Sequence, residues 1–225
     1  MTIDAVVFDL WGTVVPLTSD VRTQGEEALA SALGIKAGVL REPWRATYPE
    51  RALGGDMTAL LTHAARAAGA RASAEQVAEA LAARSRVYQE TFVARAEAVT
   101  LLRHLRARRE RTALVSNCGS DIPELYAHSE LARFFDVAVF SAVERCAKPD
   151  PAIYQRACER LDVAPEACLY VGDGTDDELR GARDLGMRAI LFIGDGEPPA
   201  WDGLHITSLL EIASLLDKPA PLATA

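Results

Sequence analysis

The stretch AVVFDLWGT, residues 5–13, decides the fold of this chain. It opens with a short apolar run in which polar residues do not alternate, a pattern typical of a strand buried on both faces. The run carries Asp9 near its end and Gly12 follows, so the carboxyl end of this strand should open into a turn. Strands covered on both faces belong to parallel sheets, which predicts an α/β protein.

Four more short apolar runs repeat this pattern further along the chain, at residues 112–116, 137–140, 168–171 and 189–193. Helical patterns accompany them at residues 98–108, 151–161, 175–185 and 209–216. Such alternation of strands and helices predicts a parallel sheet with helices on both faces.

Residues from about 18 to 95 interrupt the alternation, because they contain helical patterns and no strand pattern. The helical patterns cover residues 21–33, 57–68 and 74–92, and Ser73 with Gln76 predicts a capping box before the last one. A helical insert after the first strand would lie above the carboxyl ends of the strands, where open α/β sheets bind ligands. We predict a core of residues 1–16 and 96–217, a helical cap of residues 17–95, and a frayed tail of residues 218–225.

The composition excludes several classes of protein. A formal net charge of −8 argues against a nucleic-acid binder, which needs a basic face. The apolar runs are too short to span a bilayer, and no signal-peptide pattern occurs. The four cysteines lack zinc-site spacing and fit a reducing compartment. We expect a cytoplasmic monomer or homodimer whose partner is a small anionic substrate, not a membrane.

Four short motifs lie at or just after the ends of predicted strands. They are FDLWGT at 8–13, VSN at 115–117, KP at 148–149 and VGDG at 171–174, the last running on to Asp177 and Glu178. This set, in this order, resembles the haloacid dehalogenase superfamily over nearly the whole chain. The resemblance implies a Rossmann-like core, an α-helical cap inserted after the first strand, and hydrolase activity.

The resemblance also implies a role for particular residues. Asp9 would be the nucleophile that forms a covalent aspartyl intermediate, and Ser116 would hydrogen-bond the transferring group. Lys148 would neutralise the nucleophile and the anionic substrate. Mg²⁺ would be held by Asp9, Asp173 and the backbone carbonyl of Trp11.

Elementary chemistry supports these roles. A carboxylate can attack phosphorus and then be released by water, which splits one difficult step into two. Phosphoryl transfer requires positioning and charge neutralisation, which Mg²⁺ and a lysine supply. Mg²⁺ prefers one or two carboxylates among its ligands, and Asp9 and Asp173 meet that need.

Several assignments stay open in the sequence. The second acid of the fourth motif, expected beside the metal, is Asp177 by its spacing from Asp173 and Glu178 by its spacing from Gly181. Glu178 could instead be a capping-box partner of Thr175.

Ser116 could simply cap the next helix. Trp11 could stack on the substrate or plug the floor between core and cap.

Further residues are predicted to contact the substrate. Thr13 and Asn117 belong to the first and second motifs. Arg45 lies in a cationic and aromatic cluster of the insert, together with Arg41, Trp44 and Arg51. Arginines of this kind could hold an anionic substrate tail bidentately, although clustered arginines on a helix can also form a solvated face.

The first motif departs from the pattern of the superfamily's phosphatases, which carry a second Asp two residues after the nucleophile. Trp11 occupies that position here. An indole cannot exchange a proton at neutral pH, and general acid–base catalysis contributes about 10²–10⁴-fold. An alkyl phosphate monoester should therefore be a poor substrate unless Asp176, Thr175 or a cap residue replaces the missing acid.

The motifs favour a Mg²⁺-dependent phosphohydrolase acting on a small phosphorylated metabolite. Metal-free 2-haloacid dehalogenases also lack the second Asp, and they too have a Lys followed six residues later by Tyr, as in Lys148 and Tyr154. They replace the metal-binding Gly-Asp by Ser-rich sequence, however, and this chain keeps Gly172 and Asp173.

Two other functions fit the motifs less well. A phosphonate hydrolase would need a cap lysine, for which Lys36 is the candidate. A catalytically retired fold with a binding or regulatory role is disfavoured by the intact Asp9, Ser116, Lys148 and Asp173.

Overall fold

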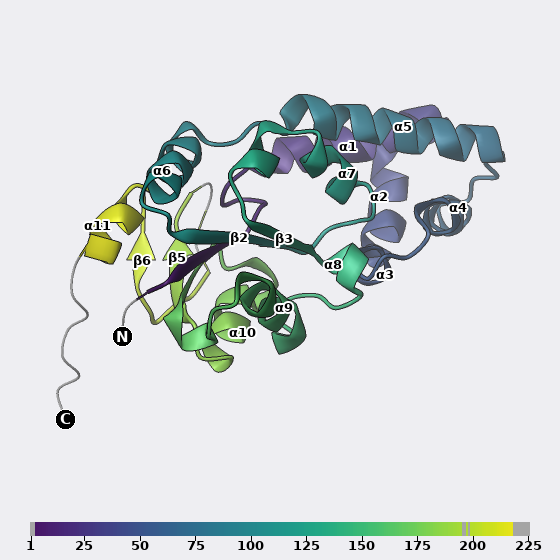
Figure 1. Cartoon of the computed structure of the whole chain (residues 1–225). Coiled ribbons are helices and arrows are strands. Elements are labelled where there is room, and N and C mark those ends of the chain that lie inside the picture. The colour runs from purple at the N-terminus through teal and green to yellow at the C-terminus, as the bar shows by residue number, and fades with distance from the viewer. Residues whose placement is uncertain (1–2, 195–196, 198, 218–225) are drawn as a thin grey trace.

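A six-stranded parallel sheet forms the centre of the protein (Figure 1). The computed structural model describes residues 3–194, 197 and 199–217. The strands lie in the order β3-β2-β1-β4-β5-β6, the Rossmann order. Their bounds are β1 Ala5–Phe8, β2 Arg111–Ser116, β3 Val137–Phe140, β4 Cys168–Gly172, β5 Arg188–Phe192 and β6 His205–Ile206. The predicted α/β fold is confirmed, and the added strand β6 has only two residues, too few to show a periodic pattern.

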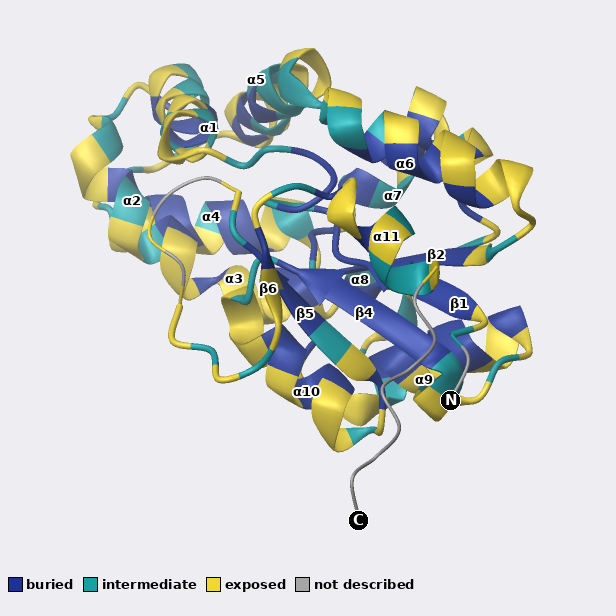
Figure 2. Ribbon diagram, turned by 90° about the vertical axis from the view of Figure 1, so that its left-hand side faces the viewer, coloured by how far each residue is buried: buried dark blue, intermediate teal, exposed yellow. Residues whose placement is uncertain are grey.

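Helices cover both faces of the sheet (Figure 1). Helices α6 (Ala96–Ala107), α7 (Ile122–Ala127) and α11 (Glu211–Asp217) pack on one face, and α9 (Pro151–Leu161) and α10 (Glu178–Asp184) pack on the other. Successive residues of β1 point into different clusters, since Val6 and Phe8 join the first and Ala5 and Val7 the second. Two-sided burial therefore explains the unbroken apolar run (Figure 2).

The insert forms helices α1 (Ser19–Ala32), α2 (Ala37–Ala46), α3 (Tyr48–Ala52), α4 (Met57–Ala67) and α5 (Ala74–Thr91). It has a hydrophobic cluster of its own, which includes Leu29, Trp44, Leu61 and Val77. The capping box of Ser73 and Gln76 is present at the start of α5. Residues 17–95 thus pack as a helical unit beside the sheet, while the exact domain boundaries stay a prediction (Figure 1).

Two sequence expectations concern the membrane and the tail. None of the helices in the described residues has the length and apolar character needed to cross a bilayer. The predicted frayed tail, residues 218–225, lies outside the described residues.

Candidate active site

The site begins at the point where the strand order reverses. The chain runs from β1 outward through β2 and β3, then returns to place β4 on the other side of β1. Asp9 directly follows β1 and Asp173 directly follows β4. Parallel neighbours end at the same edge, so both carboxylates reach the crevice where open α/β sheets bind ligands.

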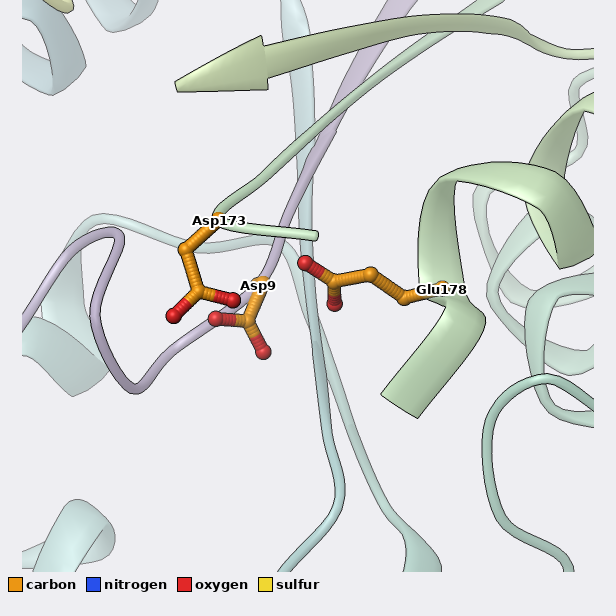
Figure 3. A group of neighbouring side chains, drawn as sticks. All are labelled: Asp9, Asp173 and Glu178. Atoms are coloured by element: carbon orange, nitrogen blue, oxygen red, sulfur yellow. The ribbon is translucent and has the colours of Figure 1, made fainter. Parts of the chain in front are cut away.

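Three carboxylates gather in this crevice. Asp9, Asp173 and Glu178 each offer an oxygen, and these oxygens lie within 4.8 Å of one another (Figure 3). Asp9 is 3% exposed and Glu178 is fully buried. Lys148 is the cation among them, because its Nζ lies 2.5 Å from Asp9 Oδ1 and also donates to Glu178. The cluster therefore holds more negative than positive charge.

Two glycines let these carboxylates approach the backbone. A Cβ on Gly172 would lie 2.0 Å from Glu178 Oε1, and a Cβ on Gly12 would lie 2.1 Å from Asp173 Oδ2. Gly12 also has a φ of +82°, which disfavours any other residue. Both motif glycines are thus required by the placement of the carboxylates.

Glu178, not Asp177, joins the cluster. Its Oε1 accepts a hydrogen bond from the Gly174 N–H at 3.0 Å, and its Oε2 accepts one from the Tyr170 hydroxyl at 2.7 Å. The capping-box interpretation is wrong, because Thr175 hydrogen-bonds Asp173 instead of Glu178. Asp177 is exposed and stands at the N-cap of α10 with a φ of +56°.

Burial and the neighbouring charges raise the pKa values of Asp9, Glu178 and Lys148. Burial, with the charge of Glu178, raises the pKa of Asp9 well above its ordinary value despite Lys148. Burial also raises the pKa of Glu178. Burial alone would lower the pKa of Lys148, but Asp9 and Glu178 raise it well above its ordinary value. A second cation would relieve the crowded carboxylates.

Asp9 has one oxygen free for such a cation. Its Oδ2 is buried and has no hydrogen-bond partner among the described residues. A buried carboxylate oxygen without a partner is costly, and hard divalent cations prefer such oxygens. Asp9 and Asp173 thus fit the expected Mg²⁺ site. The Trp11 carbonyl remains a predicted ligand.

The second motif holds the lysine loop in place. Asn117 Oδ1 accepts from the Lys148 N–H at 2.8 Å, and its Nδ2 donates to the Lys148 carbonyl at 3.0 Å and to Asp176 Oδ2 at 2.8 Å. Asn117 also lines the cavity described below. Its contacts within the protein identify it as a positioning residue for Lys148, a role that the sequence did not predict.

Two predicted site residues lie deeper in the protein. Ser116 and Thr13 are fully buried and do not line the cavity, and Thr13 Oγ1 has no hydrogen-bond partner among the described residues. The helix-cap interpretation of Ser116 is wrong, because Asp121 is the N-cap of the following helix. The predicted contacts of Ser116 and Thr13 with substrate stay predictions.

A cavity of about 730 Å³ lies between the cluster and the insert. Its core side includes Asp9, Lys148 and Asp173, and its cap side includes helices α1, α2, α3 and α5. The volume suits a small metabolite. Trp11 lines the cavity with its ring edge-on to Tyr88 and Phe92, at centroid distances of 5.6 and 5.3 Å. This geometry supports the interpretation of Trp11 as a plug between core and cap.

A family model of haloacid dehalogenase-like hydrolases matches residues 3–186. The chain belongs to this family. It is 28% identical to (S)-2-haloacid dehalogenase 4A of Burkholderia cepacia over 95% of each chain. It is 32% identical to phosphoserine phosphatase of Thermus thermophilus, over 52% of this chain and 48% of that one.

A solved structure of 2-haloacid dehalogenase from Pseudomonas syringae matches with a TM-score of 0.71 and 27% identity, over 96% of this chain and 98% of that one. Several other curated relatives are matched over about half of their length or less. The relatives of this hydrolase thus include both phosphatases and dehalogenases.

The cap side of the hydrolase differs from the sequence expectation. Arg45 lines the cavity, but its guanidinium binds Glu26 at 2.7 and 3.3 Å, and Arg41 binds the same carboxylate. Arg51 and Arg84 also line the cavity and are buried. Arg84 was not predicted from the sequence, since the pattern of a helix does not distinguish an arginine that faces solvent from one that faces a neighbouring domain.

Proposed function

We propose that this hydrolase is a Mg²⁺-dependent phosphohydrolase that acts through an aspartyl-phosphate on a small phosphorylated metabolite. The observation that carries the proposal is the unpartnered Asp9 Oδ2, buried beside two further carboxylates and one lysine. This arrangement favours a divalent cation and a ligand whose oxygens complete its coordination shell. When bound by Asp9 and Asp173, Mg²⁺ would neutralise charge on the transferring phosphoryl group.

The residues of the chain suggest the order of events. Asp9 would attack phosphorus, forming an Asp–O–P bond as the bond to the leaving oxygen breaks. Lys148, fixed through its backbone by Asn117, orients Asp9 and offsets its charge. Water would then attack phosphorus and free Asp9. Trp11 cannot protonate the leaving oxygen, so leaving groups that are stable as anions should react fastest.

A metal-free 2-haloacid dehalogenase is the second candidate. Trp11 at the position of the second acid favours it, and so does the similarity to haloacid dehalogenases along nearly the full chain. In that reaction Asp9 would attack carbon and displace halide. The cluster argues against it, because Asp173 and Glu178 would repel a haloacid's carboxylate.

Hydrolysis of p-nitrophenyl phosphate and acetyl phosphate, each with Mg²⁺ and with EDTA, tests the proposal. Both leaving groups need little protonation, so the missing acid matters least. We expect turnover with Mg²⁺ that EDTA abolishes and that Asp173→Asn greatly reduces. Turnover of 2-chloropropionate that is insensitive to EDTA would support the dehalogenase instead. Binding of Mg²⁺ and a phosphate mimic without turnover would indicate a catalytically retired fold.

A further inference from the structure

Two arginines form the cap side of the cavity. Arg51 on α3 and Arg84 on α5 are 7% and 6% exposed. Their guanidinium groups lie over aromatic rings, Arg51 at 4.0 Å from the centroid of Trp44 and Arg84 at 4.3 Å from that of Tyr88. Burying a guanidinium is costly unless a partner compensates its charge. The partners of each arginine therefore decide what the cavity can bind.

Arg84 already has its counter-ion. It forms an ion pair with Asp121, which belongs to the loop after β2, so this pair joins cap to core. Arg45 is likewise compensated by Glu26. Arg22 lines the rim of the cavity, but its side chain is exposed and water can solvate it.

Arg51 has no carboxylate partner within the described part of the chain. Its Nε donates to Thr47 Oγ1 at 3.0 Å, and its Nη2 lies 3.4 Å from the Trp44 carbonyl. Both acceptors are neutral, and they use two of the five N–H groups of a guanidinium. Asp121, whose charge also acts on Arg51, is already ion-paired with Arg84. Arg51 therefore lines the cavity as a buried guanidinium that has no ion-pair partner among the described residues.

The Nη1 atom of Arg51 is available to a ligand. It takes part in none of the hydrogen bonds found among the described residues, yet it is not one of the buried side-chain atoms without a partner. It therefore keeps some exposure to solvent, and Arg51 is one of the residues that line the cavity. Burial and the nearby Arg84 lower the pKa of Arg51 to about 10, so the group is still charged at neutral pH.

We infer that Arg51 is an anion subsite, and that the substrate carries a second anionic group, a carboxylate or a second phosphoryl, at the end remote from Asp9. This inference rests on the proposed phosphohydrolase function. The planar fork of an arginine suits either anion. Because Lys148 and Arg84 already pair with carboxylates of the protein, Arg51 is the buried cation that remains, among the described residues, for the remote anion.

Calorimetric titration of the wild-type protein with Mg²⁺ present tests the subsite. The probes are phosphonoacetate, 3-phosphonopropionate and 4-phosphonobutyrate, each compared with the alkylphosphonate of the same chain length. We expect at least one acid to bind about tenfold or more tightly than its alkyl counterpart. Propane-1,3-diphosphonate, compared with propylphosphonate, shows whether phosphoryl replaces carboxylate.

Variants show whether Arg51 causes the preference. Arg51→Met should abolish the ratio between the affinities for the acid and for its alkylphosphonate, and Arg51→Lys, which keeps the charge without the planar fork, should retain part of that ratio. Arg66→Met is the matched control, because Arg66 is an exposed arginine of α4 that does not line the cavity. Equal affinities within all three carboxylate pairs and within the diphosphonate pair, or a preference that survives in folded Arg51→Met, would overturn the inference.

A failure of the phosphohydrolase proposal can be distinguished from a failure of the anion subsite. If no alkylphosphonate binds with Mg²⁺, the phosphohydrolase proposal is wrong. Glutarate compared with pentanoate then repeats the test without a phosphonate. A preference for glutarate that requires Arg51 would uphold the anion subsite alone, and equal binding would overturn it.

Discussion

The two sides of the cavity carry opposite excess charge. The core side gathers Asp9, Asp173 and Glu178 around the single ammonium of Lys148. The cap side presents Arg51 without a carboxylate among the described residues. A single ligand would satisfy both sides if it had a group bound through a cation at the sheet and an anionic group at the cap. In that case the residues at the strand ends carry out the reaction, and the residues on the cap helices select the substrate.

The largest expected effect comes from Asp9→Asn on the core side. A neutral amide cannot attack phosphorus, so turnover of p-nitrophenyl phosphate should fall by at least about a thousandfold. The fold should be retained, because Lys148 keeps its ion pair with Glu178. Thermal melting checks the fold and initial rates check turnover. A folded variant with wild-type rate would remove Asp9 from the mechanism.

A glycine-to-alanine substitution can be made on each side of the cavity, and Gly172→Ala is the one on the core side. The new Cβ would displace the side chain of Glu178. That side chain is buried and accepts hydrogen bonds from Gly174, Tyr170 and Lys148. We expect activity to fall about a hundredfold, by analogy with the loss of a residue that supports a metal ligand, and the melting temperature to fall as well.

Gly38→Ala on α2 is the matched control, because a Cβ there meets nothing within 4 Å. It should leave activity unchanged and stabilise the protein by at most about 1 kcal/mol, since alanine loses less entropy on folding. If Gly172→Ala and Gly38→Ala had the same activity and melting temperature, the close approach of Glu178 to Gly172 would not matter for activity.

Strand ends were the part of the site that the sequence could predict. Asp9 and Asp173 meet because the parallel strands β1 and β4 end at one edge, a rule that needs only the strand pattern. Lys148 lies beyond β3 and helix α8 (Ser141–Glu144), and its place in the site was predicted from the resemblance of its motif to the family. The choice between Asp177 and Glu178 was not readable. The choice depends on the left-handed backbone at Asp176 and Asp177. Aspartate can adopt this conformation, but its presence in a sequence does not predict it.

The cap side was harder to predict for a different reason. Helices α2 and α3 were missed because Pro43 lies inside the first and the second has only five residues, too few to show a helical period. The pair of Arg84 and Asp121 joins residues 37 positions apart. A contact of this kind depends on how the cap packs against the core. The hydrophobic period of a single helix does not predict it.

Trp11→Asp tests whether the missing acid limits the core side. An aspartate there could protonate leaving groups, so turnover of an alkyl phosphate such as glycerol phosphate should rise by up to about a hundredfold. Stability should fall, because the ring contacts with Tyr88 and Phe92 are lost. Trp11→Phe keeps an aromatic ring without an acid and should not raise the rate. No gain in a folded Trp11→Asp protein would show that another step is limiting.

The smallest expected effect concerns the hydrogen bond that joins the two sides. The Tyr48 hydroxyl of the cap donates to Asp176 Oδ2 of the core at 3.1 Å, and both residues line the cavity. Burial and the charge of Asp176 raise the pKa of Tyr48 above its usual 10, so the phenol remains a donor. One hydrogen bond near the surface contributes about 1 kcal/mol, which corresponds to roughly fivefold in an equilibrium constant.

Tyr48→Phe should therefore lower kcat/KM by about two- to fivefold if this bond favours the closed arrangement of cap and core. Asp176→Asn alters the same bond, so the double variant should lose less than the product of the two single losses. Fully multiplicative losses would mean that the two residues act independently. The contact between cap and core would then depend more on the part-buried ion pair of Arg84 and Asp121, in which the Arg84 side chain is only 7% exposed.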